Sequence, residues 1–180
     1  MEKYFNTTGF CNPEKHYTIN PLRGLEKQIY DLIKNEQYFL IHASRQTGKT
    51  TLLHYLANQI NIEGKYIGLV FSVESAGYKS ISVEDADYKI IEALHKRANN
   101  DLSQQDSPPD NFKKGTTLYS YLSDWANSVN KQIVLLIDEI DSLHDDVLIS
   151  VLRQLRNGFQ DRPNKFPASI ALVGLHDIRE

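Results

Sequence analysis

One short stretch of this sequence, residues 41–60, reads IHASRQTGKTTLLHYLANQI. It leaves a short apolar segment, passes through Gly48-Lys49-Thr50 and continues with leucines at helical spacing. A strand, a loop and a helix in this order bring consecutive backbone N–H groups together at the positive end of the helix, where anions bind. The stretch therefore predicts a phosphate-binding loop between a strand at 37–42 and a helix at 49–62.

The loop residues have separate roles in this prediction. Gly48 lets the main chain approach phosphate without a β-carbon, and Lys49 reaches the β- and γ-phosphates as a catalytic cation. Thr50 offers a hydroxyl ligand to Mg²⁺, and Thr51 adds a contact to the α-phosphate. The residues expected to bind the nucleotide are Ser44, Arg45, Gln46, Thr47, Gly48, Lys49, Thr50 and Thr51.

Ala43 departs from the usual pattern G-x-x-x-x-G-K-[ST], which begins with glycine. Most phosphate contacts come from later residues of the loop, and alanine fits if its φ angle stays below zero. We therefore expect a functional loop with a slightly altered entry. The alternative is that Gly-Lys-Thr occurs here by chance.

A second motif, IVLLIDE at residues 133–139, opposes the chance interpretation. It predicts a buried strand that ends in two adjacent carboxylates, at the sheet edge where ligands bind in parallel α/β folds. Asp138 would hold Mg²⁺ together with Thr50, and Glu139 would act as the base for the attacking water. The alternative for the pair is an ordinary strand end with solvated acids, which the two motifs together make the weaker interpretation.

The rest of the chain alternates between helical and strand patterns, which predicts an α/β fold with a mostly parallel sheet. Ser142–Asp145 matches a capping box before a helix. The segment DLSQQDSPPDNFKKG, residues 101–115, has no periodicity and is interpreted as a mobile insertion or a functional loop. The aromatic stripe around Trp125 is interpreted as core rather than as a platform for nucleic-acid bases. We divide the chain into residues 1–36, a segment and helix before the loop, and 37–180, the ATPase core.

Composition and charge limit the partners and the compartment that the sequence predicts. The net charge of −3 gives no general reason to expect nucleic-acid binding, although a local basic patch stays open. The only cysteine, Cys11, cannot form an internal disulfide, which favours a reducing compartment. No apolar run is long enough to cross a bilayer. The sequence therefore predicts a cytoplasmic protein without a membrane partner.

Several stretches together resemble a family of bacterial AAA-like ATP-binding proteins, within the additional-strand, catalytic-glutamate division of P-loop ATPases. These stretches are YFNTTGFCNPEKHY, INPLRGLEKQIYDLI, IHASRQTGKTTLL, LLIDEID and LRQLRNGFQDRP. The resemblance implies a three-layer P-loop NTPase fold with core strand order 5-1-4-3-2, and ATP with Mg²⁺ as ligands. Because the sequence stops at Glu180, we expect strand 5 and the helical lid to be missing, in a fragment or in a minimal domain.

The same resemblance implies further site residues. A polar sensor residue should follow the fourth strand, where His176 or Asp177 is the candidate. Residues 17–24 would lie near the adenine, although simple packing explains Ile19 and Leu22 equally well. Candidates for a trans-acting arginine finger are Arg153, Arg156 and Arg162, each of which also suits a solvated surface.

The sequence thus predicts an Mg-ATP-binding ATPase that drives or switches a conformational change in a larger protein. The alternative is a signalling switch or scaffold with little turnover. A small-molecule kinase is disfavoured because Glu139 directly follows Asp138, and a GTPase because no N-K-x-D motif is present. A homo-oligomer or a protein partner is open, and nucleic acid is neither supported nor excluded.

Overall fold

Helices and strands alternate along the chain in the computed structural model, which describes residues 4, 15–17, 24–42 and 48–174. The α-helices are α1 (Glu26–Lys34), α2 (Lys49–Glu63), α3 (Val83–Asp101), α4 (Leu118–Ser128) and α5 (Asp145–Gly158). The strands are β1 (Tyr38–His42), β2 (Tyr66–Ser72), β3 (Gln132–Asp138) and β4 (Ser169–Gly174). Short 3₁₀ helices are η1 (Glu74–Ala76), η2 (Ile140–Ser142) and η3 (Phe159–Asp161). In this part of the chain, no helix has both the length and the apolarity that a membrane span needs.

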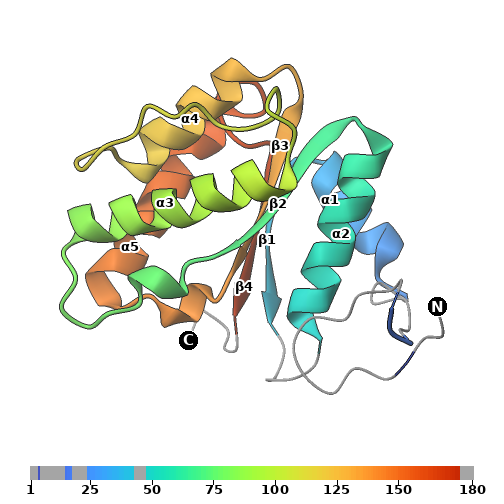
Figure 1. The fold of residues 1–180 in the computed structure, drawn as a ribbon, viewed down its shortest axis with the longest axis horizontal. Helices are drawn as coiled ribbons and strands as arrows, with labels where there is room; N and C mark the ends of the chain where they lie inside the picture. Colours follow the sequence, from blue (N-terminus) through green and yellow to red (C-terminus); the bar gives the residue numbers. More distant parts are fainter. Residues whose placement is uncertain (1–3, 5–14, 18–23, 43–47, 175–180) are drawn as a thin grey trace.

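The four strands form one parallel sheet in the order β1-β4-β3-β2. This order is the 1-4-3-2 part of the core predicted from the family resemblance. Because the strands are parallel, their carboxyl ends meet at one edge of the sheet (Figure 1). At that edge Ser72, the last residue of β2, pairs in register with Asp138, the last residue of β3.

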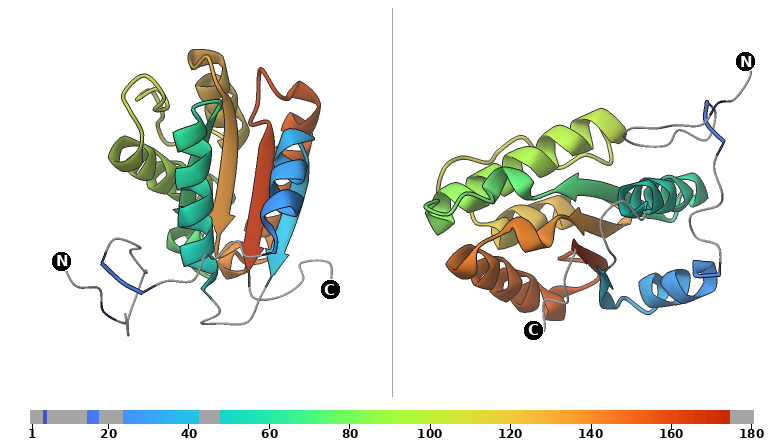
Figure 2. Two further views of the ribbon diagram at one scale, coloured as in Figure 1. Left: turned by 90° about the vertical axis from the view of Figure 1, so that its right-hand side faces the viewer. Right: turned by 90° about the horizontal axis from the view of Figure 1, so that it is seen from below.

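Helices cover both faces of the sheet. Helices α3, α4 and α5 lie on one face, and α1 and α2 lie on the other (Figures 1 and 2). Successive side chains of a strand point to opposite faces, so that Leu135 packs in the core beneath α3–α5 and Leu136 in the core beneath α1 and α2. Both residues are fully buried. The central strands read as continuous apolar runs for this reason.

The start of α5 corrects the capping box predicted at Ser142–Asp145. Ser142 ends η2, and the residue that precedes α5 is His144, whose side chain makes no capping hydrogen bond. The chain turns immediately after β3, and the Ser142 amide donates to the Glu139 carbonyl at 2.9 Å. Ser142 thus belongs to this turn and lies too early in the chain to cap the helix.

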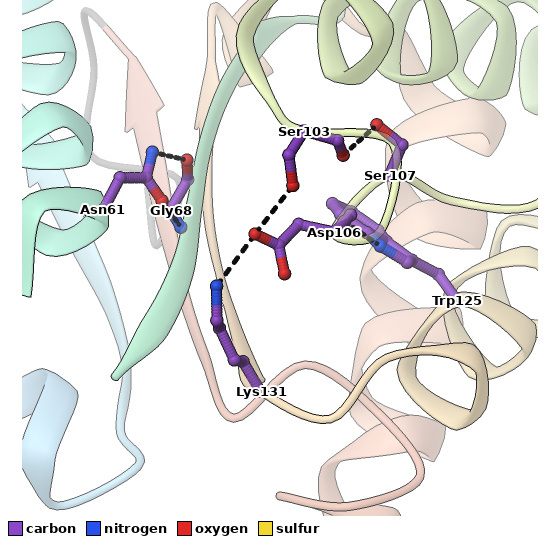
Figure 3. A network of polar contacts seen from close by, with 7 residues as sticks. All are labelled: Asn61, Gly68, Ser103, Asp106, Ser107, Trp125 and Lys131. Carbon is purple, nitrogen blue, oxygen red and sulfur yellow. Dashed lines mark hydrogen bonds and ion pairs between the residues drawn. The ribbon is translucent and has the colours of Figure 1, made fainter. Parts of the chain in front are cut away.

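The loop after α3, expected to be a mobile insertion, is attached to the body of the protein (Figure 3). Asp106 accepts from Lys131 Nζ at 2.8 Å through its carboxylate and from Trp125 Nε1 at 3.0 Å through its carbonyl. Ser103 Oγ also donates to the Asp106 carboxylate, at 3.1 Å. These contacts oppose the interpretation as a mobile insertion and leave the alternative of a functional loop open. Trp125 itself is fully buried, which confirms that its aromatic stripe is core.

Candidate nucleotide-binding site

The N-terminus of α2 and the carboxyl end of β3 meet at one edge of the sheet. Thr50, in the first turn of α2, donates from Oγ1 to Asp138 Oδ2 at 3.1 Å. The two residues are 88 positions apart in the sequence. The fold therefore brings together the Gly-Lys-Thr loop and the Asp-Glu strand end, the two motifs on which the sequence-based prediction depends.

Gly48 sets the path by which the chain enters α2. Its φ angle of 84° lies in the left-handed region, which glycine adopts at little cost. Lys49 is the first residue of α2, and the Leu52 amide donates to the Gly48 carbonyl at 2.9 Å. The first amides of a helix have no partner within it, so this end of α2 can accept an anion. Thr51 follows in the same first turn and is half-buried.

Asp138 is a buried carboxylate, with only 7% of the residue exposed. Burial raises its pKa above the ordinary value for aspartate. The Glu139 amide at 2.9 Å, the Thr50 hydroxyl and the Lys49 charge act in the opposite direction. The Lys49 ammonium is therefore close enough to Asp138 to influence it electrostatically.

Glu139 lies just beyond the strand with a left-handed backbone, at φ 59° and ψ 37°. Its side chain is exposed, and Oε2 accepts a 2.5 Å hydrogen bond from Ser72 Oγ. Ser72 Oγ in turn accepts from the Glu74 amide at 3.1 Å. Ser72 was not predicted from the sequence. The sequence does show a polar residue directly after the apolar run 66–71. Only the register of β2 against β3, however, places this residue beside the Asp-Glu strand end.

The residues present fit a magnesium ion. Thr50 and Asp138 supply one hydroxyl and one carboxylate, which are the oxygen ligands that Mg²⁺ prefers. Within the described residues no group of three or more histidine, cysteine, aspartate or glutamate side chains could hold a metal alone. The remaining ligands would be phosphate and water oxygens, as is usual for Mg²⁺.

Other predicted site residues lie outside the described part of the chain. These are Ala43, Ser44, Arg45, Gln46, Thr47, both sensor candidates (His176 and Asp177) and the two residues weighed for adenine contact (Ile19 and Leu22).

The three arginine-finger candidates lie in different surroundings. Arg153 and Arg156 are exposed on α5. The Arg162 guanidinium lies 3.4 Å from the centre of the Phe159 ring, and its Nη1 donates to the Glu36 carbonyl. Arg162 thus joins η3 to the start of β1 within its own chain.

Residues 32–180 match a family described as AAA domain. The chain belongs to the AAA domain family. Among curated proteins, no match to the sequence was found.

Solved structures with a similar fold include two Drosophila ORC assemblies. Drosophila ORC bound to poly(dA/dT) DNA and Cdc6 matches with 12% identity and a TM-score of 0.58, over 89% of this chain and 25% of that chain. Drosophila ORC bound to DNA matches with 11% identity and the same TM-score, over 86% and 25%. The AAA domain described here therefore has the α/β core of a P-loop NTPase, and it spans about a quarter of those chains.

Proposed function

We propose that this AAA domain binds Mg-ATP between the N-terminus of α2 and the carboxyl end of β3, and hydrolyses it. The observation that carries the proposal is the 3.1 Å hydrogen bond from Thr50 Oγ1 to Asp138 Oδ2. It joins a helix tip suited to phosphate with a strand end suited to a divalent cation. A solvated strand end would leave Asp138 exposed, whereas this carboxylate is buried.

Each residue has a defined part in the proposed reaction. Lys49 and the first amides of α2 bind the β- and γ-phosphates, and Thr50 and Asp138 hold the magnesium ion. When bound, the ion neutralises charge on the β- and γ-phosphate oxygens. Glu139 accepts the proton of the water whose oxygen attacks the γ-phosphorus, as the bond to the β–γ bridging oxygen breaks. Residues 44–47 of the loop would complete the phosphate contacts.

The experiment that tests this proposal is Glu139→Gln, because an amide cannot accept the proton of the water. Steady-state ATP hydrolysis should fall by roughly 10²- to 10⁴-fold, while ATP affinity measured by calorimetry stays close to that of the wild type. Glu74→Gln, an exposed acid in η1, is the matched control and should keep its turnover. Hydrolysis by Glu139→Gln at the wild-type rate would remove Glu139 from the mechanism.

A nucleotide switch with little turnover is the second candidate function, and one contact favours it. The Glu139 carboxylate accepts a 2.5 Å hydrogen bond from Ser72, which holds it toward β2 and engages its Oε2 atom. Turnover of many ATP molecules per minute would favour an ATPase that drives repeated conformational changes. Near-stoichiometric hydrolysis would favour the switch. In either case the conformational change would act on a larger protein or on further copies of the chain. Sedimentation velocity with and without ATP would detect association between copies.

A further inference from the structure

A cavity of about 820 Å³ lies on the α3 side of the molecule and shares no residue with the candidate nucleotide site. Three lysines from two separate segments line it: Lys89 on α3, and Lys113 and Lys114 in the turn before α4. Tyr78, from the loop between η1 and α3, lines it as well. Its volume falls within the usual range for small-ligand sites.

The turn that carries two of the lysines has a fixed backbone. The Lys113 amide donates to Thr116 Oγ1 at 3.1 Å, and the Thr116 amide donates back to the Lys113 carbonyl at 2.9 Å. Gly115 takes a φ angle of 91° within the turn. These bonds fix the conformation of the turn, and the ion pair of Lys114 with Asp85 at 2.6 Å links the turn to α3.

The charges that line the cavity are predominantly positive. Asp85 is its only acidic lining residue, and its carboxylate is bound by Lys114 Nζ at 2.6 Å and by Ser82 Oγ at 2.7 Å. These contacts lower the pKa of Asp85 and raise that of Lys114, which keeps both groups charged. Within the described residues neither Lys89 nor Lys113 forms a salt bridge. The Lys89 charge also acts on Asp85 from beyond salt-bridge distance, and the ammonium groups of Lys89 and Lys113 can still bind an anionic ligand.

Aromatic rings lie beside these lysines. Tyr78 is 65% exposed, a large fraction for an aromatic residue, and its ring is open to a stacking partner. Tyr88 also lines the cavity, and its ring lies 5.8 Å from that of Phe112 in a tilted arrangement. Sites for single-stranded nucleic acid combine positive charges that bind the phosphates with exposed aromatic rings on which the bases stack. This cavity has both features.

We propose that this cavity binds a segment of single-stranded nucleic acid, with phosphates on Lys89 and Lys113 and a base stacked on Tyr78. An acidic peptide would also satisfy the two ammonium groups, but its carboxylates leave the Tyr78 ring without a partner. The overall charge of −3 does not oppose the proposal, because strand binding depends on local positive charge.

Binding is measured by the fluorescence anisotropy of a labelled oligothymidylate of 15 nucleotides, at low salt and with excess Mg-ATP present. The wild type should bind, and the double variant Lys89→Glu/Lys113→Glu should bind at least about tenfold more weakly. Its slope of log affinity against log salt should fall by about 1.4, which is ~0.7 for each phosphate that the variant no longer neutralises. Lys165→Glu, an exposed lysine outside the cavity, is the control and should bind like the wild type.

Tyr78 gives an independent readout of base stacking. Tyr78→Ala should weaken binding by roughly 5- to 100-fold, whereas Tyr78→Phe should retain affinity because its ring is kept. The proposal is overturned if the wild type does not bind, or if the lysine double variant binds like Lys165→Glu. Competition by polyglutamate as strong as by unlabelled oligothymidylate would assign the cavity to acidic peptides. Binding of the wild type only when Mg-ATP is left out would place the strand in the phosphate loop instead.

Discussion

At the scale of single residues, the proposed chemistry depends on the conformation of Glu139. A glutamate with φ 59° occupies a sparsely populated backbone region, at a cost of about 1–3 kcal/mol. Two bonds hold it there: the Glu139 amide donates to Asp138 Oδ1 and the Glu139 carbonyl accepts from the Ser142 amide, both at 2.9 Å. The turn directs the carboxylate back to Ser72 on the neighbouring strand.

Ser72→Ala should raise the rate of ATP hydrolysis. Ser72 donates a short hydrogen bond to Glu139, and a bond to a charged group contributes about 1.5 kcal/mol or more. Its loss would free the carboxylate for the attacking water, with an increase in kcat of up to about tenfold. Steady-state hydrolysis at saturating ATP measures the effect. Ser75→Ala, an exposed serine in η1, is the control, and a fall in kcat for Ser72→Ala would show that Ser72 instead positions Glu139 for catalysis.

The site residues differ in how far the sequence alone could predict them. Lys49, Thr50 and Asp138 follow from local patterns, because a loop before a helix and an acid after an apolar strand can each be recognised within a few residues. The structure brings Thr50 and Asp138 within hydrogen-bond distance, while their roles toward a nucleotide stay a prediction. Ser72 could not be found in the same way, since its role depends on the pairing of β2 with β3.

At the scale of secondary-structure elements, α2 protects the outer edge of β2, which has no strand beside it in the described sheet. The Asn61 side chain donates to the Gly68 carbonyl and accepts from the Gly68 amide, both at 2.8 Å (Figure 3). It thereby replaces a neighbouring strand at this position. A β-carbon at Gly68 would lie 3.0 Å from Ile60 Cγ2, so the glycine permits the close approach of helix and strand.

Asn61→Ala should lower the stability of the domain, because it leaves two polar groups of Gly68 without their partner. The expected loss is about 1–2 kcal/mol, or a fall of roughly 2–8 °C in Tm for a domain of this size. Thermal unfolding followed by circular dichroism measures it. Asn58→Ala, at an exposed position on the same helix, is the matched control. Equal Tm values for the two variants would show that water replaces the Asn61 amide without cost.

A second link between elements connects α3, α4 and α5 through Asp87. Gln154 Nε2 donates to both carboxylate oxygens of Asp87, at 3.0 and 3.1 Å, and Gln154 Oε1 accepts from the Tyr119 amide at 2.9 Å. Asp87 is only 5% exposed. Burial raises its pKa above the ordinary 3.8, against the opposing effects of Gln154 and the Leu118 amide.

Asp87 should therefore give stability a measurable dependence on pH. Because its pKa is higher in the folded state, its contribution is fully present below pH 3.8 and is lost as the pH rises through the folded-state pKa. Asp87→Asn cannot titrate, so its stability relative to the wild type should increase with pH above about 4. Urea unfolding followed by the fluorescence of the single tryptophan measures this difference from pH 4 to 8. A difference that is flat or decreases with pH would contradict the assignment.

At the scale of the whole molecule, local patterns predicted the elements better than their arrangement. Apolar runs such as residues 133–137 identify strands that are buried on both faces, and β1 and β3 lie where the sequence predicted strands. The order β1-β4-β3-β2 came from the family resemblance, because periodicity carries no information on which strands are neighbours. The attached loop after α3 was missed for a related reason: Asp106 is held by Lys131 and Trp125, which are distant in sequence.

Ligand binding should stabilise the entire domain, because the candidate site joins α2 in one layer to β3 in the central sheet. A ligand that binds only the folded state at 100 times its Kd adds about 2.7 kcal/mol. For a domain of this size, Mg-ATP should therefore raise Tm by about 5–10 °C. Removing magnesium with EDTA should abolish most of this shift, because Thr50 and Asp138 would hold the ion in the proposed site.

Lys49→Ala separates this effect from general stabilisation by polyanions. Loss of the cation at the helix tip should weaken ATP binding by roughly 10- to 150-fold, as expected for a charged hydrogen bond, and should remove about half or more of the shift in Tm at the same ATP concentration. Lys65→Ala, an exposed lysine beyond the other end of α2, should keep the full shift. An equal shift for both variants would mean that ATP binds elsewhere, and the contact between Thr50 and Asp138 would then be part of the fold alone.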